Sequence, residues 1–270
     1  PGPPSVLDGV ASAAERVASR RPGSSGRRAT LATWLCSPDN PLVARVMVNR
    51  IWQGHFGRGL VENANDFGRQ TPRPRHPGLL DWLAVEFIDG GWSIKHIHRL
   101  IMNSAAYRAG NGASDDRQSA MATPRRLSAE RIRDAMLAVA GRLNEQMYGR
   151  PVRPELPPKF GTRYTWKVSD SVADRRRRSV YIHAKRNLPY PLLQVFDLPD
   201  MHESCARRAS TTVAPQALML LNSDLVLGMA RSFAGRVRGD VPAGDRDAAI
   251  RRAWLLAFAR APDADELDAA

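Results

Sequence analysis

Residues 40–70 of the 270-residue chain, NPLVARVMVNRIWQGHFGRGLVENANDFGRQ, mix core-forming and hydrogen-bonding side chains to a degree that few thirty-residue segments reach. Asn40 can cap a helix, and Pro41 supplies the fixed backbone angle that suits a first helical position. Apolar side chains then recur at the spacing of a single helix face, at Val43, Met47 and Ile51. We therefore predict a central helix over residues 41–56.

The segment after this helix is predicted to turn back across it. Gly57 and Gly59 interrupt the helical pattern, and Asp66 follows inside the sequence NANDFG. We expect Phe67 to fix the turn to the core, and Asp66 to pair with Arg50 or with a free backbone amide. A buried carboxylate requires such a partner, because an unpaired one costs on the order of several kcal/mol.

The composition is that of a globular protein with an excess of arginine. The chain is 43% hydrophobic and 25% charged, its net charge is +13, and among its 40 basic residues the lysines are only those at positions 95, 159, 167 and 185. The arginines suit an anionic partner, since guanidinium groups bind sulfate, carboxylate and phosphate through paired hydrogen bonds. A GC-rich genome that prefers arginine codons explains the same excess. Because the arginines are scattered and no nucleic-acid-binding motif accompanies them, a nucleic-acid partner is not expected.

The sequence contains no apolar run of about 18 residues, so no membrane span is predicted. It begins at PGPPSVLDGV, without an initiating methionine or a secretion signal, and it ends with PDADELDAA, which is typical of the first turn of a helix. We therefore expect the sequence to be an excerpt of a longer protein, truncated at its C-terminus.

The two cysteines, Cys36 and Cys205, lie outside any CxxC or CxxCH motif. This spacing excludes a zinc finger or a haem c attachment site within the chain, and no cofactor is predicted for it. The two residues can form one disulfide if the protein is exported. They can equally be two unpaired, packed thiols.

The remaining helices are predicted from apolar periodicity, caps and glycine or proline stops. They cover residues 6–21 and 27–36, a segment from Pro77 to Gly90, a segment capped by Ser93, and residues 128–143, 191–196, 215–222, 223–237 and 245–260. Residues 179–184 alternate enough for a short strand, and residues 109–123 and 149–177 are predicted as long loops. Periodicity also predicts buried faces, which include Leu31 and Leu35, Leu80, Leu83 and Phe87, Ile94 and Ile97, and Ile132, Met136, Val139 and Leu143.

Together these elements predict a mainly α fold, an irregular multi-helix domain with long loops and at most a small β element. Residues 1–26 are assigned to a linker and an N-terminal helix at the tail of a preceding region. Residues 27–270 are assigned to a single helical domain.

The first candidate site consists of polar side chains in and after the central helix: Arg50, His55, Asp66, His76 and Asp81. A carboxylate beside a histidine can act as an acid–base pair near neutral pH, which makes His55, Asp66 and His76 candidate catalytic residues. Two histidines and an aspartate can also bind a metal, but no HExxH spacing is present and no metal site is predicted. In the alternative interpretation these side chains form a hydrogen-bonded network that braces two loops against the helix.

The second candidate site is a binding site in the C-terminal half, formed by Arg178, Tyr181, Asp197, Arg207, Thr211, Thr212, Gln216 and Asn222. The two threonines precede a helix N-terminus, where free amides favour anions. With the arginines nearby, the site can hold a sulfate, carboxylate or phosphate group. The alternative is a helix cap together with an Arg–Asp ion pair. We also expect Arg178 to point inward from the basic run 175–178.

The aromatic residues divide into core and surface candidates. Trp34, Trp52, Trp82 and Trp92 lie on apolar helix faces or at helix ends, and are predicted to be core. Tyr164 and Trp166 lie in the long loop, and are the candidates for stacking on a sugar ring.

Four separated blocks of the chain resemble the planctomycete family known as domain of unknown function 1553, the C-terminal domain of cytochrome-c-associated exported proteins. They are residues 40–68, with Asn40-Pro41, Asn49-Arg50, His55-Phe56-Gly57 and Asp66-Phe67-Gly68; residues 76–108, with LLDWLA and HRLIMNSAAYR; residues 125–141, with RRLSAERIRDAML; and residues 178–222, with Arg178-Ser179-Val180-Tyr181 and PQALMLLN. The Asp-Pro-x-Asn segment that this family usually carries before the third block is missing from residues 115–121.

The resemblance implies an exported domain, periplasmic or secreted, that follows other domains of the same polypeptide, of which one can carry haem c. It implies a binding or scaffold module of a larger polysaccharide-related or cytochrome-c-linked protein, with polysaccharide or another anionic ligand as partner. A hydrolase or lyase that acts on polysaccharide through His55, Asp66 and His76 is the alternative. Nucleic-acid binding through the arginine-rich surface is the second alternative.

Overall fold

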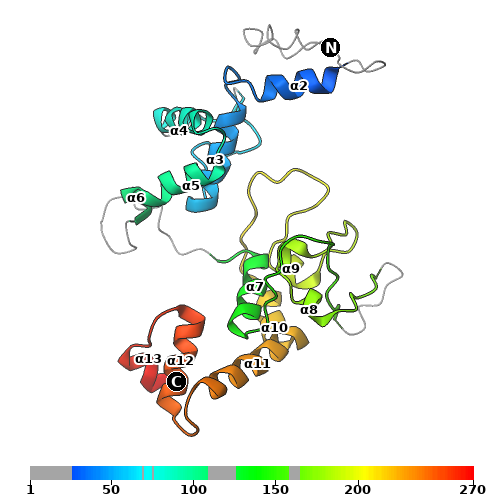
Figure 1. The fold of residues 1–270 in the computed structure, drawn as a ribbon, viewed down its shortest axis with the longest axis vertical. Coiled ribbons are helices and arrows are strands. Elements are labelled where there is room, and N and C mark those ends of the chain that lie inside the picture. Colours follow the sequence, from blue (N-terminus) through cyan, green and yellow to red (C-terminus); the bar gives the residue numbers. More distant parts are fainter. Residues whose placement is uncertain (1–25, 69, 75, 109–125, 158–164) are drawn as a thin grey trace. The chain divides into compact units, whose positions relative to one another are not determined.

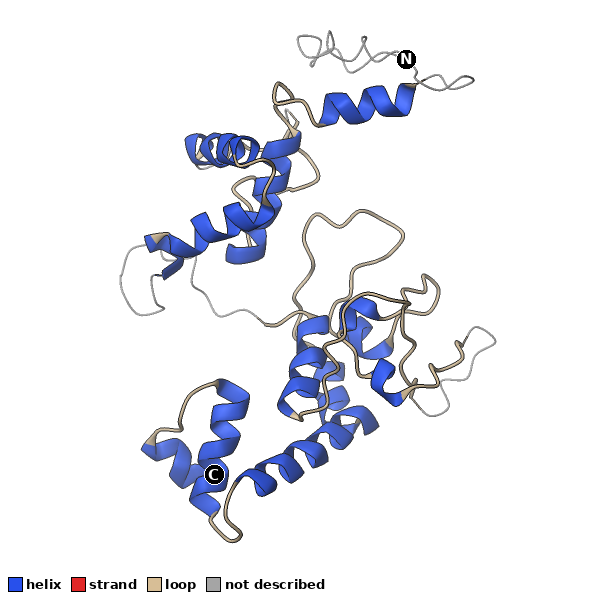
Figure 2. Ribbon diagram, viewed as in Figure 1, coloured by secondary structure: helices blue, strands red, loops and turns tan. Residues whose placement is uncertain are grey.

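The computed structural model describes residues 26–68, 70–74, 76–108, 126–157 and 165–270, and within these ranges it contains helices and no β-strand. Figure 2 shows helices joined by loops of very different lengths. Two isolated bridges, Asn144 to Arg177 and Val152 to Ile182, are the β structure of the described residues. The prediction of a mainly α fold is therefore confirmed. The predictions for residues 6–21, for residues 109–123 and for Tyr164 lie outside the described residues.

The chain divides into two compact units, Pro1–Arg125 and Arg126–Ala270, each with its own core. Unit 1 contains the helices α2 (Arg27–Leu35), α3 (Val43–Phe56), α4 (Pro77–Asp89), α5 (Ile94–Asn103) and α6 (Ala105–Arg108) (Figure 1). The assignment of residues 27–270 to a single domain stays a prediction.

The predicted cap of the central helix is confirmed, although the helix begins two residues later than expected. The Asn40 side chain is buried, and its Oδ1 accepts hydrogen bonds from the backbone amides of Leu42 (3.0 Å) and Val43 (3.3 Å). α3 ends at Gly57, whose φ of 77° lies in the left-handed region that glycine adopts without steric cost.

The buried face of α3 differs from the predicted stripe. Its core side chains are Ala44, Val48, Ile51, Trp52 and Phe56, whereas Met47 is only partly buried. α4 and α5 both pack against this face (Figure 1) and contribute Leu80, Leu83, Ala84, Phe87, Ile97 and Ile101 to the same cluster. The spacing of apolar residues identified the helix, but the position of two packing partners decided which side is buried.

The NANDFG turn folds back over α3 as predicted. The buried Asn49 side chain donates to the Val61 carbonyl (3.0 Å) and accepts from the Val61 amide (2.9 Å). Arg50 donates to Asn65 Oδ1 (2.7 Å), and Phe67 packs against the core cluster. Gly59 is required here, because a Cβ at this position would lie 2.8 Å from the amide group of Asn49.

The starts of α4 and α5 follow the sequence signals. Pro77 occupies the first turn of α4, and Ser93 Oγ accepts a hydrogen bond from the His96 amide at the start of α5. Several side chains predicted to be buried are nevertheless exposed: Leu31, Leu35, Trp82 and Ile94. An apolar position in a helix is buried only where another element covers it, and α2 has no buried residue at all.

Unit 2 contains α7 (Ala129–Val139), α8 (Val172–Arg175), a 3₁₀ turn η4 (Ser179–Tyr181), α9 (Pro191–Val195), α10 (Ala214–Asn222), α11 (Asp224–Asp240), α12 (Arg246–Phe258) and α13 (Ala264–Ala269). The predicted strand over residues 179–184 is wrong: residues 179–181 form the turn η4, with the Ser179 amide bound to the Asp134 side chain, and the bridge of Ile182 to Val152 is isolated. α7 ends at Val139, and the fully buried side chains on it are Ala129, Arg133 and Leu137, not Ile132, Met136 and Val139.

No single helix among the described residues has the length and apolar character to cross a membrane. α10 and α11 meet these criteria only when taken together, as a pair bent by 54°.

Candidate functional site

Asp66 and Arg50 do not pair with each other. Asp66 is half-buried rather than buried, and its Oδ1 accepts a hydrogen bond from the Gly68 amide at 2.7 Å, so the backbone-amide alternative is confirmed. Arg50 binds the neighbouring Asn65 side chain instead. Both residues therefore stabilise the turn that crosses α3, as in the network interpretation.

The two candidate histidines of unit 1 have different surroundings. His55 Nε2 lies 2.7 Å from His98 Nδ1, and its ring meets the Tyr107 ring edge-on at 5.3 Å. His76 is exposed at the start of α4, where its carbonyl oxygen accepts from the Leu80 amide. His98 was not recognised from sequence, because it lies 43 residues from His55 and local spacing cannot connect the two.

A catalytic role for His55, Asp66 and His76 stays a prediction. The contacts given above join the side chain of His55 to His98 and that of Asp66 to the Gly68 amide, whereas the contact of His76 is through its backbone carbonyl. Among the described residues, no group of three or more His, Cys, Asp or Glu side chains has the arrangement that a metal ion requires.

Part of the second candidate site comes together around Asp197. This residue has a left-handed φ of 62°, and its carboxylate accepts from the Thr211 amide (2.8 Å) and the Thr211 hydroxyl (2.8 Å). Arg126, which the sequence did not single out, forms an ion pair with the same carboxylate. The amide of Thr211, its hydroxyl and Arg126 together hold the pKa of Asp197 below its usual value, against the opposing effect of burial. The buried Gln216 closes the cluster by donating to the Val195 carbonyl. This cluster matches the predicted alternative of an Arg–Asp ion pair, with Arg126 in place of Arg178 or Arg207.

The other members of the predicted binding set lie on the surface. Exposed side chains are those of Arg178, Arg207, Thr212 and Asn222. The expectation that Arg178 points inward is wrong, because Arg177 is the buried member of the basic run, at 3% exposure. The guanidinium group of Arg177 lies over the Tyr181 ring at 4.0 Å, so Tyr181 is placed against Arg177 rather than Arg178.

Arg133 is a second buried arginine that sequence analysis missed. Its side chain is 2% exposed and donates to the carbonyls of Arg175 (2.6 Å) and Arg177 (3.0 Å) and to Ser179 Oγ (3.2 Å). A guanidinium group carries five N–H donors, and here it binds carbonyl groups at and just after the C-terminal end of α8. Arg133 and Arg177 therefore shape unit 2 from inside.

Trp166 is not available for sugar stacking. It is 8% exposed, its ring stacks on Tyr190 at 6.3 Å, and its Nε1 donates to the Pro154 carbonyl. The prediction that assigned it to ligand stacking is wrong, because Trp166 packs into the apolar cluster that includes Leu188 and Tyr190. Burial in this cluster also raises the pKa of the Tyr190 hydroxyl.

Both cysteines are free and exposed. The interpretation of Cys36 and Cys205 as packed thiols is therefore wrong, and they are unpaired in this structure.

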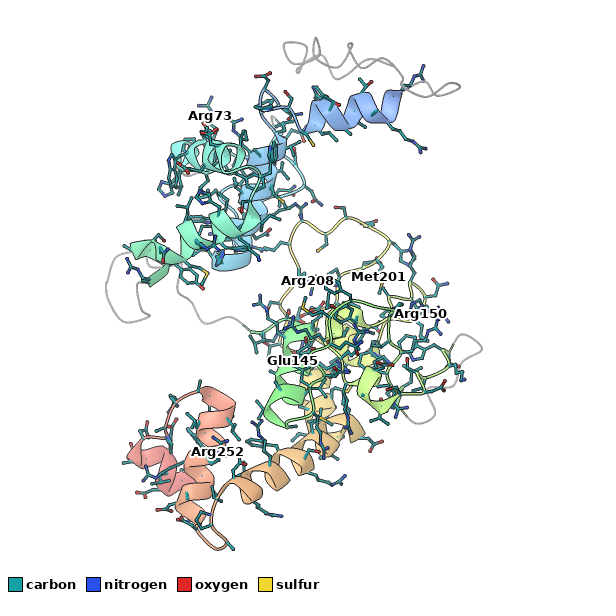
Figure 3. All side chains as sticks on the ribbon, in the orientation of Figure 1. Arg73, Glu145, Arg150, Met201, Arg208 and Arg252 are labelled. Carbon is teal, nitrogen blue, oxygen red and sulfur yellow. The ribbon has the colours of Figure 1, made fainter. Side chains whose placement is uncertain are left out.

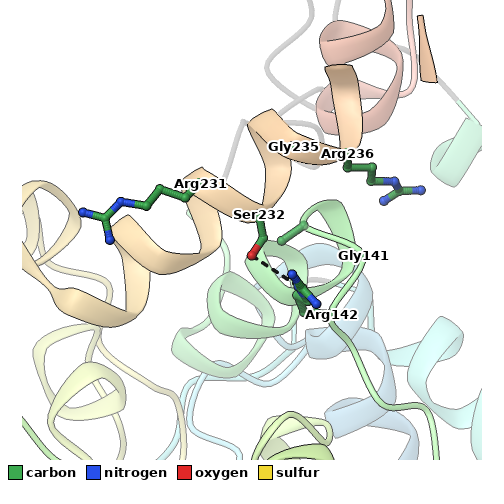
Figure 4. A pocket seen from close by; sticks show the side chains of 7 residues that line it. Gly141, Arg142, Arg231, Ser232, Gly235 and Arg236 are labelled. Carbon is green, nitrogen blue, oxygen red and sulfur yellow. Dashed lines mark hydrogen bonds between the residues drawn. The ribbon is translucent and has the colours of Figure 1, made fainter. Parts of the chain in front are cut away.

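A hollow of about 630 Å³ lies between the C-terminal end of α7 and the middle of α11. Its lining residues are Ala140, Gly141, Arg142, Arg231, Ser232, Gly235 and Arg236. Figure 4 shows the three guanidinium groups at separate points along the hollow rather than converging on one point. No local sequence pattern marks this hollow, because its residues come from two segments about 90 positions apart.

The three arginines of the hollow are differently restrained. Arg142 Nε donates to Ser232 Oγ (3.2 Å), and Arg236 Nη1 donates to the carbonyls of Ala138 (3.0 Å) and Val139 (2.8 Å) at the C-terminal end of α7. Arg231 is exposed, and no described residue accepts a hydrogen bond from it. Within the described part of the chain, none of the three forms an ion pair with a carboxylate. The hollow is therefore a cationic surface with free hydrogen-bond donors.

The chain matches, over residues 27–270, the family model described as Protein of unknown function (DUF1553). No curated protein and no solved structure matches it.

Proposed function

The chain belongs to the DUF1553 family of proteins of unknown function, and we propose that within this family it is a binding module for an acidic polysaccharide rather than an enzyme. The observation that carries the proposal is the hollow between α7 and α11, lined by Arg142, Arg231 and Arg236 without a described carboxylate as counter-charge.

The spacing of these three arginines favours a polymer over a small anion. A guanidinium group binds sulfate or carboxylate through paired hydrogen bonds, and separate guanidinium groups match charges that repeat along a chain. The net charge of +13 adds a long-range attraction for polyanions. Arg142 is held by one hydrogen bond and Arg236 by two, so their remaining donors are partly oriented before a ligand arrives.

The two alternatives receive less support. A hydrolase or lyase requires two groups within reach of one bond, and the contacts of His55, Asp66 and His76 go to separate partners. Nucleic acid carries the same charge as an acidic polysaccharide, so it is included as a competitor in the experiment below. We propose further, from the family resemblance alone, that the domain acts outside the cytoplasm beside upstream domains of the same polypeptide, one of them with haem c. Cell fractionation of the host would test this location.

Dextran sulfate and uncharged dextran form a matched pair of probes, because they share a backbone and differ in charge. We expect the protein to bind dextran sulfate more tightly, with an affinity that falls as salt is raised. Arg231→Ala should weaken this binding about ten-fold at low salt, because a charge-assisted hydrogen bond is lost. Arg251→Ala is the control, since it removes the same charge from an exposed position on α12.

Equal affinity for the two dextrans, or affinity that does not change with salt, would contradict the proposal. If single-stranded DNA displaces dextran sulfate at equal charge concentration, the hollow is a nucleic-acid-binding site and the second alternative is correct.

A further inference from the structure

Tyr148 combines an unfavourable backbone conformation with an exposed ring. It follows α7 in the loop over residues 144–150, its φ is 64°, and its side chain is 77% exposed. Figure 3 labels Glu145 and Arg150, which lie near the two ends of this loop. A bulky residue rarely adopts a left-handed φ unless the surroundings enforce it.

The surroundings of Tyr148 do enforce this conformation. Buried Arg177 donates to the Gln146 carbonyl through Nε (3.3 Å) and Nη2 (3.2 Å), to the Arg150 carbonyl through Nη1 (3.1 Å), and to the Tyr148 carbonyl. The Tyr148 amide in turn donates to the Tyr181 hydroxyl at 2.8 Å. Arg177 lies over the ring of this same Tyr181, so one buried arginine and one tyrosine fix the loop from its inner side.

The Tyr148 ring is not needed for this arrangement. The bonds that Arg177 and Tyr181 make to the loop go to its backbone groups, and asparagine or glycine would adopt the same φ with less strain. The ring itself contributes little burial, because most of its surface faces solvent. A rigid loop thus presents one aromatic face to solvent without the entropy cost of ordering it upon binding.

We propose that Tyr148 is a stacking platform for a pyranose ring of the polysaccharide. This inference rests on the proposed function: the arginines bind the acidic groups of the ligand, and Tyr148 binds a sugar ring. One face of a pyranose ring presents C–H groups that pack against an aromatic ring, while its hydroxyl groups point to the sides. Glu145, Gln146 and Arg150 are exposed beside Tyr148 and can hydrogen-bond such hydroxyl groups.

The size of the apolar surface favours a sugar over a protein partner. In this loop the exposed large apolar residues are Met147 and Tyr148, preceded by Gln146 and followed by Gly149 and Arg150. A stable protein interface buries about 800 Å² on each partner, whereas a sugar ring needs only one aromatic face.

The experiment compares Tyr148→Asn with Tyr148→Phe in the full chain, using dextran sulfate and dextran over a series of salt concentrations. Asparagine tolerates the left-handed φ, so Tyr148→Asn removes the ring without disturbing the loop, and its melting temperature should equal or exceed that of the parent. We expect its affinity for dextran sulfate to fall about ten-fold at every salt concentration while the salt dependence stays unchanged, because stacking involves no ion pair. Tyr148→Phe should bind within about two-fold of the parent.

Two further variants give the experiment its controls. Phe258→Ala removes another exposed aromatic ring of unit 2, and it should leave the affinity unchanged. Tyr181→Phe keeps the ring under Arg177 but removes the acceptor of the Tyr148 amide. We expect it to weaken binding several-fold, because the Tyr148 ring is then held less firmly in its binding position. The double variant Tyr148→Asn/Tyr181→Phe should bind dextran sulfate as Tyr148→Asn does, because Tyr181→Phe has no effect once the ring is absent.

The binding data distinguish an error in the role of Tyr148 from an error in the proposed function. If Tyr148→Asn binds dextran sulfate like the parent, Tyr148 is not a stacking platform, and the arginine site is unaffected. If the parent binds both dextrans equally and Tyr148→Asn loses both, the platform stands and the anionic preference is wrong. If the parent binds neither dextran, both are wrong. A dimer that dissociates in Tyr148→Asn during sedimentation, with no change in dextran binding, would overturn the platform and assign the ring to a protein contact.

Discussion

The two units of this chain fill their interiors in different ways. Unit 1 packs α3, α4 and α5 around an apolar cluster, and Asn49 is the buried hydrogen-bonding side chain at the centre of α3. Unit 2 has its own apolar cluster around α9, but it also encloses Arg133 and Arg177. The difference follows from backbone structure: helices satisfy most of their own carbonyl groups, whereas carbonyls of residues 146–150 and of residues 175 and 177 accept from buried arginine side chains.

Buried guanidinium groups in unit 2 supply hydrogen bonds to backbone carbonyls that lie outside or at the ends of its helices. Arg133 and Arg177 together donate to carbonyls of Gln146, Tyr148, Arg150, Arg175 and Arg177. These bonds hold residues 146–150 against Arg177, and residues 175–177 against α7. Unit 2 should therefore depend on single side chains more strongly than unit 1 does, and the predictions below test this dependence.

The largest expected effect is that of Arg133→Met. This variant leaves buried carbonyl groups of residues 175 and 177 without a donor, so the free energy of unfolding of unit 2 should fall by roughly 3–5 kcal/mol. Urea denaturation followed by circular dichroism measures the loss, and hydrogen exchange should show earlier opening of residues 173–181. Arg131→Met changes an exposed position on the same helix and should stay within about 0.5 kcal/mol of the parent. If the two variants unfold alike, buried arginines do not hold unit 2 together.

Asn49→Ala is the corresponding change in unit 1. Its side chain bonds both backbone groups of Val61, so its loss should cost roughly 2–3 kcal/mol of the free energy of unfolding. Asn103→Ala, at the exposed end of α5, is the control with an expected change below about 0.5 kcal/mol. The same denaturation experiment compares the two units. If Asn49→Ala lowers the free energy of unfolding more than Arg133→Met does, unit 1 depends on single buried side chains more strongly than unit 2.

A third prediction concerns pH and Asp197 of unit 2. The Thr211 amide and hydroxyl and Arg126 lower the pKa of Asp197 in the folded state. This stabilisation is present at neutral pH and is lost as the pH falls from the ordinary aspartate pKa through the lowered one. Asp197→Asn keeps the left-handed backbone and should cost roughly 1–2 kcal/mol at pH 7.

Thermal melts of the parent and of Asp197→Asn at pH 7 and in stepwise more acidic buffers provide the measurement. The difference between the two should shrink as the pH falls, because protonation removes the charge that the substitution removes. A difference that is constant with pH would show that the carboxylate charge plays no part in holding residues 197–211.

The smallest expected effect is that of Asp66→Asn in unit 1. The carboxylate is half-buried and uses one oxygen to accept from the Gly68 amide, and an asparagine side chain can accept the same bond. The free energy of unfolding should change by less than about 0.5 kcal/mol. Asp66→Ala removes the acceptor and should cost more, about 1 kcal/mol. If Asp66→Asn lowers the free energy of unfolding by much more than this, unit 1 also depends on a charged side chain, and the two units differ less than proposed.

Local signals in the sequence were sufficient for most helices and their ends. Ser93, Pro77 and Gly57 lie where capping and backbone geometry require them, and the helices that follow or precede them are confirmed. The binding candidates Thr211 and Gln216 also lie together in the structure, because they precede and begin the same helix. These features arise from interactions within about five residues, which is the distance over which a sequence pattern is informative.

The sequence by itself therefore determined a mainly helical chain, the family to which it belongs, and the turn held by Asp66. Only the tertiary structure decided which arginines are buried, that His55 meets His98, that Trp166 is covered, and that three arginines line one hollow. The physical reason is the range of the interactions. Arg133 is stable inside the protein because its acceptors lie 42 to 46 residues further along the chain, and such partners are defined only once the segments pack against each other.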